Sequence, residues 1–134
     1  MDTPYPVVLK PEHQPLLPLI IFELVRPFID DDLRVLNSPQ RLRILADLAG
    51  LAWNLSRLDG EPEAAGVARR MRADLEKDSA IAAKIMDELL RRARAVTILE
   101  APTSEHVSVI FEGGTLIVTA LPRFPKGARG SEVH

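Results

Sequence analysis

The stretch HVSVIFEGGTLIV, residues 106–118, decides the fold of this chain. Apolar and polar residues alternate on both sides of Gly113 and Gly114, which is the pattern of two β-strands joined by a two-residue turn. With both glycines in the turn, Phe111 faces Leu116 in an antiparallel pair. One face of the hairpin is then entirely apolar, because side chains alternate between the two faces. That face carries Val107, Val109, Phe111, Leu116, Val118 and Ala120.

The apolar face of this hairpin needs a cover, since a two-stranded hairpin alone is at best marginally stable in water. Residues 95–100 (AVTILE) have the alternation of a third strand, which predicts an antiparallel meander over residues 96–121, and residues 6–9 (PVVL) are a candidate fourth strand. We expect the apolar face to pack on helices. The opposite face carries Ile110 and Ile117 among polar residues; it is either plain surface or the place where a partner or second subunit docks.

The middle of the chain, residues 19–95, has helical periodicity. Its best-marked helix has Ser38 as a candidate N-cap, Pro39 at the first helical position and Gly60 at its end. Trp53 lies in this helix and is either core packing or an interface anchor. One wide buried face is predicted for the helix, made of Ile44, Leu45, Leu48, Leu51, Ala52, Leu55 and Leu58.

Two more helical segments flank this one. Pro18 suits the first turn of a helix that Pro27 would break or kink. Residues 62–95 keep small or apolar side chains at alternating spacings of four and three, interrupted by Asp78. This pattern is typical of one long amphipathic helix or of an antiparallel hairpin with a new N-cap at Asp78 or Ser79. Three to five helices are therefore expected.

The two ends of the chain lack helical periodicity. Five of the eleven prolines fall within residues 1–18, which predicts an extended arm, and residues 122–134 read as a flexible tail. The start has no signal-peptide pattern, and the apolar run 16–29 is shorter than the ~20 residues that span a membrane. We expect one cytoplasmic α+β domain, helical in its N-terminal two thirds, that ends in an antiparallel β-meander of about three strands.

Composition limits the chemistry. The chain has no cysteine, which excludes disulfides, thiolate metal sites and cysteine nucleophiles, and its net charge of −2 carries no polyanion-binding signature. The histidines, His13, His106 and His134, lack zinc-site spacing. The run 30–32 (DDD) cannot converge on one ion within a helix, where neighbouring side chains diverge. No glycine-rich phosphate loop or nucleophile elbow occurs. The sequence predicts no catalytic residue, cofactor or metal.

Two arginine clusters are the sharpest functional lead. They are RRMR, with Arg69, Arg70 and Arg72, and RRAR, with Arg91, Arg92 and Arg94. On one straight helix they would lie on the same side, ~33 Å apart, where both contact phosphates. However, residues 61–95 hold eight basic and seven acidic residues, with no aromatic residue to stack on bases. A salt-paired, solvated face is the simpler interpretation.

These observations favour a non-catalytic protein–protein interaction module: an adaptor, assembly factor, inhibitor or regulatory subunit that acts through its surface, with a protein partner or as a homo-oligomer. The candidate interface residues are Ile110, Ile117, Phe124 and Trp53. One alternative is a nucleic-acid-binding regulator that uses the arginines of the two clusters. A second alternative is a small enzyme with an unmarked site. The use of arginine over lysine, with abundant alanine, is typical of a GC-rich bacterial genome.

Overall fold

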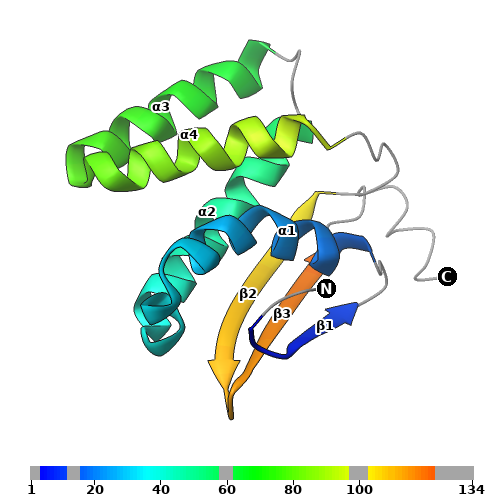
Figure 1. The fold of residues 1–134 in the computed structure, drawn as a ribbon. Helices are drawn as coiled ribbons and strands as arrows, with labels where there is room; N and C mark the ends of the chain where they lie inside the picture. The colour runs from blue at the N-terminus through cyan, green and yellow to red at the C-terminus, as the bar shows by residue number, and fades with distance from the viewer. Residues whose placement is uncertain (1–3, 12–15, 58–61, 97–102, 123–134) are drawn as a thin grey trace, which may run out of the picture.

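The structure is a computed structural model that describes residues 4–11, 16–57, 62–96 and 103–122 (Figure 1). Helices make up the middle of the chain, and a small sheet pairs a strand before them with two strands after them, which confirms the α+β class. The elements in chain order are strand β1 (Val7–Pro11), helix α1 (Leu16–Asp31), 3-10 helix η1 (Leu33–Asn37), helices α2 (Pro39–Arg57), α3 (Pro62–Asp78) and α4 (Ala80–Arg94), and strands β2 (Ser104–Glu112) and β3 (Thr115–Pro122).

The β2–β3 hairpin has the predicted register. Phe111 pairs with Leu116, and the remaining pairs follow in step. Gly113 and Gly114 have φ of 59° and 80°, a left-handed backbone that other residues rarely adopt, so two glycines set the turn. The predicted apolar face is the buried one: Val107, Val109, Leu116, Val118 and Ala120 are at most 8% exposed, and Phe111 is half-buried.

The third strand comes from the arm at the start of the chain. The sheet order is β1-β3-β2, and β1 runs parallel to β3. The purely antiparallel meander is therefore wrong, although the candidate strand at residues 6–9 is confirmed with a shift of one or two residues. Ala95 is the C-cap of α4, and residues 97–100 lie outside the described part. A parallel neighbour needs a long crossover, which the intervening helices provide.

The first helix differs from its predicted limits. Helix α1 begins at Leu16, so the extended arm is shorter than expected and Pro18 lies in the first turn, where backbone N–H groups have no partner within the helix. Pro27 does not end α1, which continues to Asp31. The predicted start of α2 is confirmed, because Ser38 Oγ accepts a hydrogen bond from the N–H of Arg41 at 3.3 Å. The predicted end at Gly60 lies outside the described residues.

Residues 62–94 form an antiparallel hairpin of two helices, α3 and α4. Ser79 is the break: it has an extended backbone, and its Oγ accepts a hydrogen bond from the N–H of Ala82 at 3.1 Å. Helix α4 packs on α2, and α3 packs on α4. The hairpin thus lies beyond α1 and α2, on the side away from the sheet (Figure 1).

The core lies between the sheet and helices α1 and α2. Helix α2 buries most of its predicted face, since Leu45, Leu48, Ala52 and Leu55 are at most 7% exposed, whereas Ile44 is 46% exposed and Leu51 is half-buried. Leu58 lies outside the described residues. The buried face extends to Ala46, Ala49 and Trp53, which are fully or almost fully buried. Small side chains on the inner side let the helix approach the sheet closely, and the large indole fills the remaining space. The packing interpretation therefore holds for Trp53, whose side chain is 0% exposed and has no surface to offer a partner.

Helix α2 touches the start of β2 at an unusually close contact. A Cβ added to Gly50 would lie 3.0 Å from a methyl group of Val107, which is tighter than most carbon–carbon contacts, so Val107 would have to shift. One turn later, the side-chain amide of Asn54 forms two hydrogen bonds with the backbone of Ser104. Its Oδ1 accepts the backbone N–H of Ser104 at 2.7 Å, and its Nδ2 donates to the Ser104 carbonyl at 2.9 Å. Asn54 therefore fixes where β2 begins.

Replacing Asn54 by alanine should destabilise the protein by about 1–3 kcal/mol, because the buried N–H of Ser104 is left without an acceptor. Asn37→Ala is the control, since Asn37 is exposed at the end of η1, and it should change stability by less than about 0.5 kcal/mol. Urea unfolding followed by circular dichroism measures both. Equal losses would contradict a specific role of the Asn54 amide.

Tyr5 joins the β1 end of the sheet to α1. Its hydroxyl donates to Asp30 Oδ1 at 3.1 Å, and its side chain is buried. Burial, together with the hydrogen bond and the negative charge of Asp30, raises the pKa of Tyr5 from 10.0 to about 12. The neutral phenol is thus favoured in the folded state. Its contribution to stability is fully present below pH 10 and is lost as the pH rises toward 12.

Tyr5 is the only tyrosine, so the alkaline absorbance change of tyrosinate reports on it alone. We expect a midpoint near pH 12 in the folded protein, and a lower midpoint in Asp30→Asn that still lies above the ordinary value because burial remains. A guanidinium-unfolded sample gives the ordinary midpoint as a reference. A folded protein that titrates at that same midpoint would contradict the buried contact.

Candidate interaction surface

The outer face of the sheet is the one that α1 and α2 do not cover. Val8 pairs with Ile117 on one side of β3, and Ile110 pairs with Ile117 on the other. The three side chains therefore form one continuous row across all three strands, because directly paired residues point to the same face. Val8 and Ile110 are each 44% exposed, and Ile117 between them is half-buried. We call Val8, Ile117 and Ile110 the outer row.

Polar residues surround the outer row. Lys10, Thr119 and Ser108 form the next row toward one end of the strands, and Thr115 with Glu112 lies toward the other. All five are exposed or half-buried. An apolar centre with a polar rim is the composition of a protein–protein contact surface. These side chains offer hydrophobic contact at the centre, with the charges of Lys10 and Glu112 at the margin.

The outer row contains one residue that the sequence did not mark. Ile110 and Ile117 were placed together by the hairpin register, but Val8 joins them only because β1 pairs with β3. The sequence PVVL predicts a strand at residues 6–9, but it does not indicate which strand pairs with it. Of the other candidate interface residues, Trp53 lies in the core, and Phe124 lies outside the described residues.

The two arginine clusters lie on different helices. The guanidinium of Arg72 binds the carboxylate of Asp87 across the hairpin, with two hydrogen bonds of 2.8 Å, so the two helices are antiparallel at this level. Residues 69 and 70 are then level with residues 89 and 90 on α4. The straight-helix geometry, with clusters ~33 Å apart, is therefore wrong. The hairpin brings both clusters toward its open end.

Several of these arginines form ion pairs with carboxylates. Asp87 and Glu76 raise the pKa of Arg72, and Arg72 in turn lowers the pKa of Asp87. Glu88 binds both Arg91 and Arg92, at 3.0 and 3.1 Å. These groups are exposed, so each ion pair adds little to stability, but each reduces the local positive charge.

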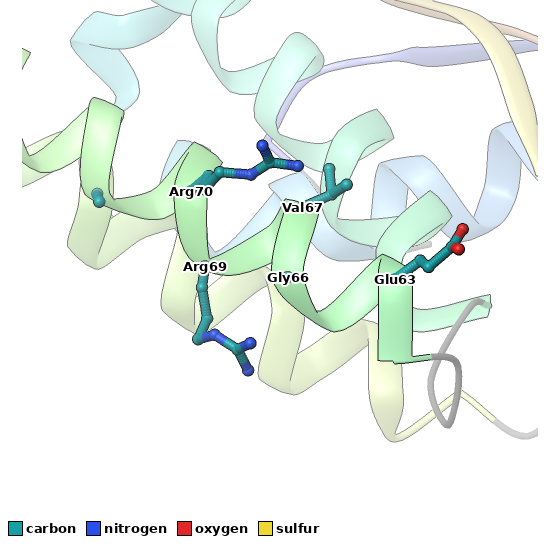
Figure 2. Close-up of a pocket in the computed structure, with 6 residues that line it drawn as sticks. Glu63, Gly66, Val67, Arg69 and Arg70 are labelled. Atoms are coloured by element: carbon teal, nitrogen blue, oxygen red, sulfur yellow. The ribbon is translucent and has the colours of Figure 1, made fainter.

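Arg69 and Arg70 do not converge on one point. Figure 2 shows the Arg70 side chain at the upper side of α3 and the Arg69 side chain below the helix, with Val67 and Glu63 on the same stretch of helix. The open depression that they line also carries the carboxylate of Glu63.

Among the residues that the structure describes, the acidic residues and histidines that could bind a metal ion do not form a site. Asp30 accepts from Tyr5 and Arg26, whereas Asp32 caps η1 and binds Arg34, which lowers the pKa of Asp32. Within the described ranges, no three histidine, aspartate or glutamate side chains gather as metal ligands would. His106 lies exposed on β2. None of the helices, over the same ranges, has the length and apolar character needed to cross a bilayer.

Comparison of the chain with protein-family models, with curated proteins and with solved structures found no match. The functional argument therefore rests on the surfaces of this chain. Of these, the outer row is the one that combines exposed apolar side chains, a fixed backbone register and a polar rim.

Substitutions at two adjacent residues of β2 can test whether the outer face is exposed to solvent. Val109 is 3% exposed on the inner face and Ile110 is 44% exposed on the outer face. We expect Val109→Thr to destabilise the protein by roughly 1–3 kcal/mol, because it buries a hydroxyl, and Ile110→Thr to cost less than about 1 kcal/mol. Thermal unfolding of both variants at the same concentration checks this. A larger loss in Ile110→Thr would mean that another part of the protein covers the outer face.

Proposed function

We propose that this chain is a small, non-catalytic protein-interaction module, such as an adaptor, assembly factor, inhibitor or regulatory subunit, that binds its partner through the outer face of its sheet. The observation that carries the proposal is the outer row, Val8, Ile117 and Ile110, which crosses all three strands on the face away from the helices. The cytoplasmic location and bacterial origin suggested by the sequence stay predictions.

The physical argument is burial of the outer row by a partner. Each aliphatic side chain of this size gains roughly 1.5–3 kcal/mol when it goes from full exposure to full burial, and these three are already partly covered. Their contribution is therefore a fraction of that, concentrated at the centre of the face. Lys10 and Glu112 at the margin supply charge that selects between partners more than it strengthens binding. An interface of moderate affinity follows.

The sheet also restricts how a partner approaches. Strand β3 is paired on both sides, whereas β1 and β2 are the outer strands of the described sheet. A partner on the outer face contacts side chains of all three strands at once. The row lies across the strands and is about 10 Å wide, given the spacing of neighbouring strands. This geometry suits a partner with a complementary apolar ridge.

A nucleic-acid-binding regulator is the alternative that one observation favours. The hairpin brings the two arginine clusters to the same end, with Arg69 and Arg70 on one helix and Arg94 on the other. Against it stand the carboxylates of Glu76, Asp87 and Glu88, which already bind arginines. This function requires affinity that falls steeply with salt. The hypothesis of a small enzyme stays a prediction without an assembled site.

The test is a tagged pull-down from the native cell, with the wild-type chain and with the double variant Val8→Glu, Ile110→Glu. Both residues are substantially exposed, so the substitutions place charges on the outer face without opening the core. We expect a protein partner in molar proportion to the wild-type bait, insensitive to nuclease, and loss of at least nine tenths of it with the double variant.

Val67→Glu is the matched control, because Val67 is an exposed apolar residue on α3. Helix α3 packs on α4, which packs on α2, so two helices separate α3 from the sheet. The Val67→Glu variant should retain the partner, and circular dichroism should show the same helix content in all three proteins. A partner that binds the double variant as well as the wild type would refute the outer face as the docking site. Recovery of nucleic acid in place of a protein would favour the alternative.

A further inference from the structure

A groove lies between the N-terminal halves of α2 and α4, and the end of α1 and η1 line it as well. It has a volume of about 550 Å³. Aliphatic side chains form most of its lining, among them Val35, Ile44, Leu48, Ile81 and Ile85. This groove is separate from the outer face of the sheet, and none of the outer-row residues contributes to it.

The rim of the groove is unusually apolar for a protein surface. Ile81 is 72% exposed and Ile44 is 46% exposed, while Leu45 and Leu48 at the base are each 5% exposed. The exposure of Ile44 is the feature in which α2 departs from its predicted buried face. Exposed side chains of this size, continuous with a buried apolar base, indicate a place where an apolar group binds.

The polar group best placed to select a ligand is the guanidinium of Arg41. The carboxylate of Asp32 also lines the groove. It already receives two side-chain hydrogen bonds from Arg34, at 2.9 and 3.2 Å, and one from the backbone N–H of Arg34, so its charge is largely compensated. Arg41 reaches the same carboxylate only at 4.0 Å. Most donors of Arg41 therefore remain available to a second anion. The first turns of α2 and α4 add the positive ends of two helix dipoles.

The arrangement along α2 defines the shape of the ligand. Arg41 lies in the first turn, and Leu48 lies two turns later, roughly 10 Å along the helix. The cation is thus at one end of the groove and the apolar base extends away from it. The volume falls within the range typical of small-molecule sites, roughly 300–1,000 Å³. A short, linear molecule with one anionic end matches this pattern of charge and shape.

We propose that the groove binds a medium-chain alkyl carboxylate, with the carboxylate on Arg41 and the alkyl chain along Ile44, Leu48 and Ile85. This site is independent of the outer face of the sheet. The charge of Arg41 selects an anion over a cation of the same chain length. The apolar walls make affinity depend on chain length, because each further buried methylene group contributes to binding.

The test is calorimetric titration of the intact protein with decanoate below its micelle-forming concentration. We expect binding of one molecule per chain. Octanoate should bind roughly tenfold more weakly, since it lacks two methylene groups. Decyltrimethylammonium, which has the same chain and the opposite charge, should not bind measurably at the same concentrations. Arg41→Gln should weaken decanoate binding about three- to fivefold, because Arg41 is exposed and an exposed ion pair contributes up to about 1 kcal/mol.

Arg43→Gln is the matched control. It removes the same charge from the same helix, but Arg43 does not line the groove, so it should leave decanoate affinity within about twofold. Ile44→Glu should abolish binding, whereas Ile110→Glu on the sheet should not change it. Unchanged helix content by circular dichroism shows that each variant is folded.

Three outcomes would overturn the proposal. They are the absence of decanoate binding by the folded wild type, equal affinity for decanoate and decyltrimethylammonium, and equal weakening by Arg41→Gln and Arg43→Gln. If decanoate does not bind and Ile44→Glu loses a protein partner that Ile110→Glu retains, the groove is a protein-docking surface and the carboxylate proposal is wrong.

Discussion

Burial of the inner face of the β2–β3 hairpin against α1 and α2 is the interaction on which the rest of the structure depends. Leu116 and Val118 at its centre are 0% exposed. Because the two-glycine turn fixes the register, burying these side chains also determines every residue of the opposite face. The outer row is therefore a consequence of the turn: a slip of one residue would exchange the apolar core face and the surface that we propose binds a partner.

The one-sided packing of this small sheet leaves two apolar surfaces outside the core. Helices α1 and α2 cover only the inner face, and α2 is held close to β2 by Gly50 and by the Asn54 amide. That close approach requires small residues on the inner side of α2. It turns Ile44 away from the core and into the groove beside α4, so the groove and the tight helix–sheet contact have a common cause.

In the α3–α4 hairpin, the tertiary structure decides where the two arginine clusters lie and which carboxylates they bind. The two arginine clusters form a regular repeat along the chain, but the break at Ser79 folds one helix back on the other. Arg72 then binds Asp87, which is fifteen residues away in the sequence. A single straight helix would hold the two clusters ~33 Å apart on one side. The hairpin instead places them on two helices toward the same end, where carboxylates partly neutralise them.

The sequence by itself determined the features set by neighbouring residues: the hairpin register, the glycine turn, the Ser38 cap and the α+β class. Only the tertiary structure decided that β1 pairs in parallel with β3, that Val8 completes the outer row, that Trp53 is buried and that Ile44 is exposed. Periodicity shows that one face of an element is apolar. It does not specify which distant element covers that face, because that depends on shape and close packing between segments far apart in the chain.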